Sequence, residues 1–265
     1  SATIISEAAF DTAKRSNYIF YHPARQDRSG AVIHDMLLGH AYAFRQNMTY
    51  GGACALQTLP YLTEHLEMID TLGLSHVLRF ACPPDFQNRT WNIKLHTRLN
   101  TLLWSAQWIV RIRSLQRIPS YMPSELSSTS VVVHIRRGDV SLCNPTTHDR
   151  YLPNDHYLKL LETYAKPSDA SVFIYSESKS IESWDDFQKF DLRLDTRPSN
   201  VWRAMMNASV LILSKSSFSV VPALFNRHGL IVYTPFWVKP LPGWIVVDDV
   251  TDRASHRATI RLQGN

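Results

Sequence analysis

Ser130-Val131-Val132-Val133-His134-Ile135-Arg136-Arg137-Gly138-Asp139 joins an apolar run rich in β-branched residues directly to two arginines, a glycine and an aspartate. The apolar run predicts a buried strand, because β-branched side chains pack well on a pleated sheet. The charged residues then follow the carboxyl end of this strand. Ligands of open parallel sheets bind at that end, so the stretch predicts a strand and a binding loop together.

Three more apolar runs follow along the chain and alternate with helical patterns. The runs cover residues 170–175, 210–213 and 230–233, and the helical patterns cover 154–165, 180–190 and 199–208. This alternation predicts an α/β fold with a parallel sheet flanked by helices. Polar loops at 176–178 and 214–219 also come directly after strands, so we expect them to meet the arginine loop at one edge of the sheet.

The first half of the chain is expected to be rich in helices. An apolar run at 17–21 predicts a strand, and helical patterns follow at 34–46, 55–70 and 91–115. Between 119 and 130 the composition turns to Pro, Ser and Thr, as is typical of a connection between domains. We therefore expect an N-terminal domain at 1–125 and a C-terminal domain at 126–265, the final segment of which packs back on the first domain.

The composition excludes several classes of protein. A net charge of +5 is mild for 265 residues, and its basic residues do not form the dense runs of nucleic-acid arms, so an anionic small ligand fits better than nucleic acid. No apolar stretch reaches the roughly 18 residues of a membrane span. We expect a cytoplasmic location, in preference to a Golgi lumenal domain from which an anchor has been trimmed.

The three cysteines, Cys54, Cys82 and Cys143, form no motif of a disulfide framework or a zinc site. We expect free thiols and no metal.

The two arginines suit a phosphate ligand, because a guanidinium can form paired hydrogen bonds to phosphate oxygens. If Arg136 faces the pocket, Arg137 points elsewhere and is structural, and Asp139 can fix one of them by an ion pair. Gly138 lets the backbone approach a ligand closely. The alternative interpretation of such an arginine pair is a surface ion-pair cluster.

The serine-rich loop is a second candidate anion site. Hydroxyls and backbone N–H groups after a strand and before the apolar helix expected at 220–225 can bind an anion. The alternative for Ser216 to Ser219 is an ordinary helix cap.

The arginine loop, residues 134–139, resembles the His-x-Arg-Arg-Gly-Asp signature of the α1,2- and α1,6-fucosyltransferases. A second stretch, 204–219, is similar to the helix, strand and serine-rich loop of that family, with the same order and spacing. The resemblance implies the GT-B fold, in which two Rossmann-like domains face a central cleft. It also implies a donor site in the C-terminal domain and an acceptor site in the N-terminal domain.

Two weaker matches depart from the family pattern. The stretch 172–178 resembles a strand that ends in Ser-Asp, but Glu177 stands where the family has aspartate. The stretch 30–43 is similar to the glycine-rich opening of the family, but His34-Asp35 replaces Asn-Gln and the second glycine is missing. Inferences about the nucleotide base and the acceptor are weaker for this reason.

By residue, the resemblance implies a contact of Arg136 with the β-phosphate, of His134 with the nucleoside and of Glu177 with the base or ribose. The residues expected at the donor are His134, Arg136, Arg137, Gly138, Glu177, Ser214, Ser216, Ser217 and Phe218.

The sequence contains no Asp-x-Asp, the paired carboxylates that commonly hold a divalent ion with nucleotide sugars. We therefore expect no cofactor and no metal, with Arg136 stabilising the departing diphosphate. Inversion by direct displacement needs a group that takes the acceptor proton. The candidates are Asp35, His34, Asp149 and His148, and Asp35 is preferred. The alternative for either aspartate is a cap or a solvated charge.

We therefore expect a metal-independent inverting glycosyltransferase that transfers a sugar from a nucleotide-sugar donor, GDP-fucose in the first place, to a glycan hydroxyl. A second hypothesis keeps the fold but has a UDP-sugar donor such as UDP-xylose, because the compact size resembles chlorovirus glycosyltransferases, which act in the host cytoplasm. A third is a glycan- or nucleotide-binding module without catalysis. A nucleic-acid binder ranks last, because clustered basic residues with exposed aromatics are missing.

Overall fold

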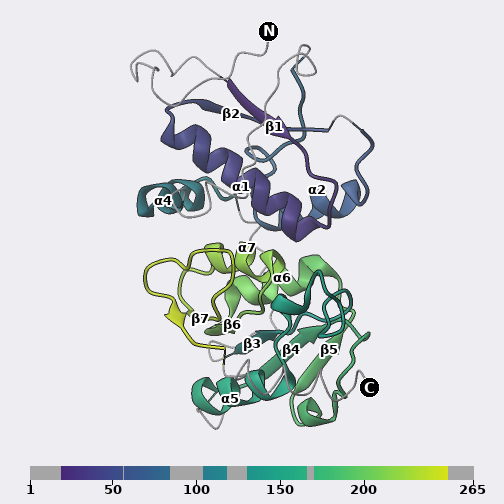
Figure 1. Cartoon of the computed structure of the whole chain (residues 1–265). Coiled ribbons are helices and arrows are strands. Elements are labelled where there is room, and N and C mark those ends of the chain that lie inside the picture. The colour runs from purple at the N-terminus through teal and green to yellow at the C-terminus, as the bar shows by residue number, and fades with distance from the viewer. Residues whose placement is uncertain (1–18, 56, 84–103, 118–129, 166–169, 250–265) are drawn as a thin grey trace. The chain divides into compact units, whose positions relative to one another are not determined.

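The computed structural model describes residues 19–55, 57–83, 104–117, 130–165 and 170–249. The chain divides into two units, Ser1–Ser120 and Tyr121–Asn265 (Figure 1). The domain boundary expected at residue 125 and the end of the final segment, residues 250–265, lie outside the described residues.

The first unit is built on a strand–helix–strand motif. Strands β1 (Ile19–Pro23) and β2 (Thr49–Cys54) are parallel neighbours, and helix α1 (Ser29–Arg45) connects them. Two shorter helices follow, α2 (Leu62–Thr71) and α4 (Ala106–Ser114). They occupy parts of the helical patterns expected at 55–70 and 91–115, of which residues 91–103 lie outside the described part.

Strand β2 was not expected, because Gly51 and Gly52 interrupt its apolar pattern. The glycines have a packing reason: a Cβ on Gly51 would lie 2.5 Å from the ring of Tyr21 in β1. Gly52 has φ +132°, and a Cβ there would lie 2.5 Å from the backbone carbonyl oxygen of Arg79. Gly52 therefore requires a residue without a side chain, whereas a side chain at Gly51 would displace Tyr21.

A disulfide joins Cys54 at the end of β2 to Cys82, 28 residues further on. A bridge between Ala53 and Phe80 runs beside it and brings the two segments together. Only Cys143 is a free thiol, and it is exposed. The expectation of free thiols was wrong for Cys54 and Cys82, because their proximity depends on the folded chain and not on their spacing.

The second unit contains a six-stranded, entirely parallel sheet. Its strands are β3 (Val131–His134), β4 (Val172–Ser176), β5 (Asp191–Leu194), β6 (Val210–Ile212), β7 (Leu230–Tyr233) and β8 (Ile245–Val246). Helices α5 (Asn154–Tyr164), α6 (Pro198–Asn207) and α7 (Ser217–Phe225) connect successive strands. The expected α/β class is confirmed.

The strand order is β5-β4-β3-β6-β7-β8. This is the Rossmann order, in which the chain first winds outward in one direction and then returns to the centre and winds in the other. The direction reverses between β3 and β6. In folds of this order, ligands bind at the carboxyl ends of the two strands where the reversal occurs.

Alternate side chains of β3 meet different helices. Figure 1 shows α5 on one face of the sheet and α6 and α7 on the other. Val131, Val133 and Ile135 pack in a buried cluster on the α5 face, whereas His134 contacts Phe218 of α7. The other buried members of the α5-side cluster are Leu152, Tyr157, Leu160, Leu161, Ile174, Phe187, Ile212 and Val232. This period of two places successive loop residues on opposite faces as well.

The helix expected at 180–190 is wrong. The structure has a short 3₁₀ turn at Asp185–Phe187, followed by β5. The hydroxyls of Ser180 and Ser183 accept hydrogen bonds from backbone N–H groups two residues ahead, at 3.2 and 3.1 Å. Such local bonds compete with helical ones and favour turns.

Within the described part of the chain, no helix has both the length and the apolar character to cross a membrane.

Candidate functional site

A hydrogen bond joins the two loops at the switch point of the sheet. Nδ1 of His134, the last residue of β3, lies 2.6 Å from the hydroxyl oxygen of Ser214, which follows β6. The imidazole also packs against the ring of Phe218, with ring centroids 5.1 Å apart. The end of β3 is therefore tied to the start of α7.

Arg136 makes three side-chain contacts at this point. It pairs with Asp139, with Nη2 2.8 Å from Oδ2 and Nε 3.3 Å from Oδ1. Its Nη1 donates to the hydroxyl of Ser216 at 3.1 Å. Its side chain is one-fifth exposed, and Asp139 is about half exposed. The guanidinium is thus held in place and still reaches solvent.

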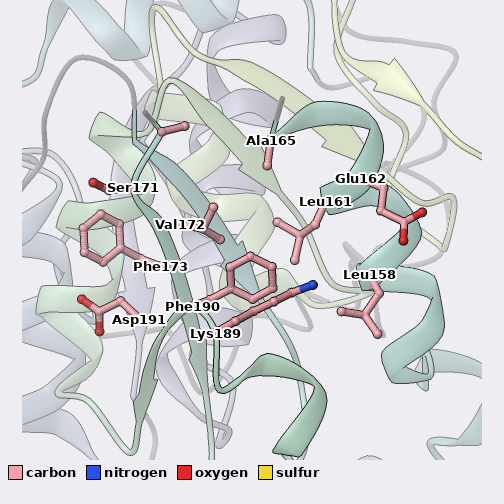
Figure 2. A pocket seen from close by; sticks show the side chains of 11 residues that line it. Leu158, Leu161, Glu162, Ala165, Ser171, Val172, Phe173, Lys189, Phe190 and Asp191 are labelled. Atoms are coloured by element: carbon pink, nitrogen blue, oxygen red, sulfur yellow. The ribbon is translucent and has the colours of Figure 1, made fainter. Parts of the chain in front are cut away.

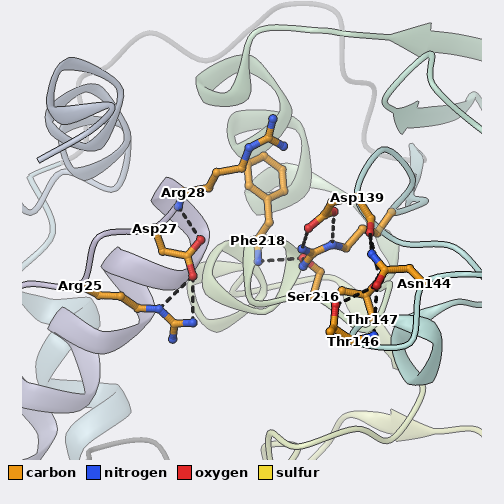
Figure 3. Close-up of polar contacts among 10 residues, drawn as sticks. Arg25, Asp27, Arg28, Asp139, Asn144, Thr146, Thr147, Ser216 and Phe218 are labelled. Atoms are coloured by element: carbon orange, nitrogen blue, oxygen red, sulfur yellow. Dashed lines mark hydrogen bonds and ion pairs between the residues drawn. The ribbon is translucent and has the colours of Figure 1, made fainter.

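Ser216 is the N-cap residue of α7. Its hydroxyl accepts a hydrogen bond from the backbone N–H of Phe218 at 3.2 Å, as Figure 3 shows. The N-terminus of a helix carries partial positive charge and N–H groups without intrahelical partners. The Arg136 guanidinium and the N–H group of Phe218 thus meet at the hydroxyl of Ser216. Both carry positive charge or partial charge, and such an arrangement favours an anion nearby. Ser216 is therefore a helix cap, and the same hydroxyl also lies at the candidate anion site.

Arg137 lies on the α5 face and is completely buried. Its guanidinium donates to the carbonyl oxygens of Arg136 and Leu152, to Asn154 at 2.7 Å and to Glu182 at 3.0 Å. It also lies 4.7 Å from the centroid of the Tyr151 ring. The Arg137 side chain is turned into the protein interior, as expected for a structural arginine beside an outward-facing Arg136, because of the period of two along the loop. A contact of Arg137 with the donor stays a prediction.

His134 is neutral at physiological pH. Burial, together with the positive charge of Arg136, lowers its pKa to about 3. The ring therefore acts as a hydrogen-bonding group and not as a cation toward an anionic ligand.

Gly138 and Glu177 lie against each other. Gly138 has φ +72°, and its N–H donates to the carbonyl oxygen of Lys179 at 2.9 Å. A Cβ on Gly138 would clash with Oε2 of Glu177. The glutamate expected to approach the nucleoside is thus brought to the arginine loop by the loop that follows β4.

Lys215 was not predicted, although it lies within the serine-rich loop. Its side chain is buried, and Nζ lies 2.9 Å from Oδ2 of Asp249 and 3.4 Å from the carbonyl oxygen of Asp149. Ser219 supports the same loop by donating to the carbonyl oxygens of Ser214 and Ser216, both at 3.1 Å. The single basic residue within the serine-rich loop is the feature of the sequence from which Lys215 could have been predicted as part of the site. Ser217, the first residue of α7, is buried.

Asp149, one candidate base, belongs to the second unit. It lies exposed on a 3₁₀ turn, His148–Arg150, and Nδ1 of His148 is 3.1 Å from the carbonyl oxygen of Pro145.

Asp35, the other candidate base, belongs to the first unit. It is largely buried on α1, 3.9 Å from Nη1 of Arg25 and 3.8 Å from Nδ1 of His34. The Arg25 guanidinium also pairs with Asp27 at 2.8 Å, and Asp27 accepts the backbone N–H of Arg28 (Figure 3). The carboxylate of Asp35 is thus desolvated and lies within reach of a cation.

A cavity of about 690 Å³ lies at the opposite edge of the second unit (Figure 2). Val172 and Asp191, at the amino ends of β4 and β5, line it together with the last turns of α5. Its lining is Leu158, Leu161, Glu162, Ala165, Ala170, Ser171, Val172, Phe173, Lys189, Phe190 and Asp191. None of the predicted site residues is among them, so the cavity and the polar loops are separate features.

Among the residues that the structure describes, no three His, Cys, Asp or Glu side chains gather as potential metal ligands.

No protein-family model and no curated protein matches the chain. One solved structure that matches the chain is the Escherichia coli heptosyltransferase WaaC with ADP-2-deoxy-2-fluoro heptose. The identity is 10%, the match covers 94% of this chain and 100% of that one, and the TM-score is 0.45. A likeness of this degree assigns no residue role to the chain.

Proposed function

We propose that the chain is a glycosyltransferase of the GT-B type, which binds the diphosphate of a nucleotide-sugar donor at Arg136 and Ser216 and transfers the sugar to a glycan hydroxyl. The observation that carries the proposal is the contact of the Arg136 guanidinium with the N-cap hydroxyl of α7 at the switch point between β3 and β6. Ligands of doubly wound sheets bind at such a point.

The charges around Arg136 favour replacement of its ion-pair partner, Asp139, by the diphosphate of a donor. Asp139, its partner, is about half exposed, so solvent screens the pair and it contributes little energy. A donor diphosphate carries more charge than one carboxylate and can use the α7 N-terminus as well. On this proposal Arg136 turns from Asp139 toward the phosphate oxygens, while Ser216 keeps its place at the cap.

The same geometry supports transfer without a metal ion. When the bond between the sugar C1 and the diphosphate oxygen breaks, negative charge gathers on the leaving diphosphate. Once the donor is bound and Arg136 has turned toward it, the guanidinium and the helix N-terminus are already in place to stabilise this charge. We propose an inverting displacement, in which the acceptor hydroxyl attacks C1 from the opposite side and loses its proton to a base of the protein.

We propose Asp35 as this base. The resemblance implies an acceptor site in the N-terminal domain, and Asp35 lies in that unit, on α1, whereas Asp149 lies in the second unit. Asp35→Asn should lower kcat by roughly 10²- to 10⁴-fold and leave diphosphate binding unchanged. Asp149→Asn is the matched control, and an equal loss of kcat in the control would contradict the assignment.

The donor proposed first is GDP-fucose, with a UDP-sugar such as UDP-xylose as the alternative, because Glu177 departs from the acidic residue of the resembling family. Calorimetric titration of the purified chain with GDP and with UDP, in the presence of a chelator, separates the two. Incubation with GDP-fucose and UDP-xylose, followed by mass spectrometry of glycan acceptors, then tests transfer. Binding of neither diphosphate contradicts the proposal, and binding without hydrolysis or transfer indicates a non-catalytic binding module.

A further inference from the structure

We infer that Asn47 carries an N-linked glycan and that Asn207 does not, although both stand in the acceptor pattern Asn-x-Ser/Thr. The pattern occurs at Asn47-Met48-Thr49, Asn88-Arg89-Thr90 and Asn207-Ala208-Ser209. Asn144-Pro145-Thr146 is excluded by its proline. Asn88 lies outside the described residues. The inference is independent of the proposed function.

Asn47 is presented on an exposed turn. It connects α1 to β2, has φ +53°, and is exposed, as is Thr49 at the first position of β2. Backbone bonds from Asn47 to Phe44 and from Met48 to Ala43, at 3.1 and 2.8 Å, hold the turn without using the side-chain amide. The left-handed backbone explains an asparagine or glycine here, but it does not require the threonine two residues later.

Asn207 has the opposite surroundings. It is the last residue of α6 and is partly buried, and its Nδ2 donates to the carbonyl oxygen of Arg203 at 2.8 Å. Nδ2 is the atom that would carry the sugar. The backbone N–H of Ser209 is bonded to the carbonyl oxygen of Ser130 at 2.9 Å, which fixes the segment at the start of β6. A sugar on Nδ2 would leave that atom one N–H and would have to fit beside its contact with Arg203 at a partly buried position. A folded chain is therefore expected to leave Asn207 unmodified.

The disulfide supplies the second, independent observation. Cys54 ends the strand that Asn47 precedes, and its bond to Cys82 requires an oxidising compartment. In a eukaryotic cell that compartment is the secretory lumen, where asparagine glycosylation also takes place. The disulfide therefore argues against the cytoplasmic location expected from the sequence. It favours the compartment in which the host enzyme for asparagine glycosylation would meet Asn47.

The chemistry is a group transfer from a lipid-diphosphate-linked oligosaccharide. A bond forms between Nδ2 of Asn47 and C1 of the first sugar, and the bond between C1 and the diphosphate oxygen breaks. The lipid diphosphate leaves, and the amide proton passes to a base of the host transferase. The exposed hydroxyl of Thr49 is the part of the acceptor pattern that the transferase recognises.

The test is expression of the full chain through the secretory pathway of a eukaryotic cell, followed by site-by-site peptide mass spectrometry before and after enzymatic release of N-glycans. The Cys54–Cys82 bond is mapped in the same sample under non-reducing conditions. Asn47→Gly keeps the left-handed turn and removes the acceptor amide. Thr49→Val suits the strand and removes the pattern, whereas Thr49→Ser keeps it.

We expect a glycan on Asn47 in the unaltered chain and in Thr49→Ser, its complete loss in Asn47→Gly and Thr49→Val, and an unmodified Asn207 throughout. An unmodified Asn47 in secreted protein with an intact disulfide would overturn the inference. A glycan on Asn207 would overturn its structural basis, and free thiols at Cys54 and Cys82 in the secreted protein would overturn its premise about the compartment.

Discussion

Along β3 and the loop after it, successive side chains enter two different surroundings. On the α5 face, Val131, Val133 and Ile135 lead to an arginine that is sealed in the interior by hydrogen bonds and aromatic rings. On the α7 face, His134 leads to an arginine that touches a helix N-cap and solvent. Two identical, adjacent residues thus have different surroundings, because the strand period assigns them to opposite faces. We therefore expect Arg137 to contribute to stability, and the ligand contact of Arg136 is the proposal that this difference supports.

Arg137→Ala should give the largest loss of stability. It leaves the buried Asn154 amide and the Leu152 carbonyl without their donor and Glu182, which is one-third exposed, without its cation, and each unsatisfied buried group costs about 1–3 kcal/mol. Chemical denaturation monitored by circular dichroism measures the free energy of unfolding. A loss below about 1 kcal/mol would show that the α5 face does not depend on this arginine.

Acidification should lower the free energy of unfolding through His134, which lies on the α7 face. The pKa of His134 is lowered to about 3 in the folded chain, against about 6.5 when unfolded, so the unfolded chain binds a proton first as pH falls. The stability contributed by the neutral ring is complete above pH 6.5 and is lost progressively toward pH 3, by up to about 1.4 kcal/mol per pH unit.

The matched variant is His134→Gln, which keeps a polar side chain without this titration. Its unfolding free energy should fall less steeply between pH 6.5 and pH 5 than that of the unaltered chain. His40 and His156, whose pKa values burial lowers to about 4, contribute equally to both proteins and cancel in the difference. Parallel pH profiles would contradict the assignment of a neutral, buried His134.

Ser216→Ala should have a smaller effect on stability and a clear effect on binding. Loss of the N-cap of α7 costs about 1 kcal/mol. The same change removes the hydroxyl that positions Arg136, so diphosphate affinity should fall as well. Ser216→Asp restores the cap but adds a negative charge beside the phosphate, so thermal melting and calorimetry together separate the two roles. Recovery of affinity in Ser216→Asp would argue against an anion at this point.

The sequence predicted the centre of the second unit well, because its strands are continuous apolar runs buried on both faces. Strands β3, β4, β6 and β7 lie where such runs were found. Strand β5 was missed, since an edge strand that is only half buried, Asp191–Leu194, has no apolar run. Strand β2 was missed because its glycines serve the packing of Tyr21 and Arg79, which no local pattern reveals.

The sequence predicted which loops meet, because each of these loops directly follows a strand of the parallel sheet. His134, Arg136, Ser214 and Ser216 were expected to meet and do so. The separate role of Arg137 follows from the period of two, but its partners Asn154 and Glu182 come from other segments and could not be read from the motif. The Cys54–Cys82 bond depends in the same way on long-range folding. The choice between Asp35 and Asp149 stays a prediction.

Arg136→Ala tests the central claim most directly, because it should change stability least of all, by less than about 1 kcal/mol, and binding most. The measurement is metal-free calorimetric titration with GDP and UDP, with Arg193→Ala as the control. Arg193 also pairs with an aspartate, Asp191, at 2.8 Å but lies on β5. We predict a loss of diphosphate affinity of roughly 10- to 100-fold in Arg136→Ala and none in the control, as expected for hydrogen bonds to a charged group. Equal affinity in the unaltered chain and in Arg136→Ala would contradict a diphosphate site at the switch point.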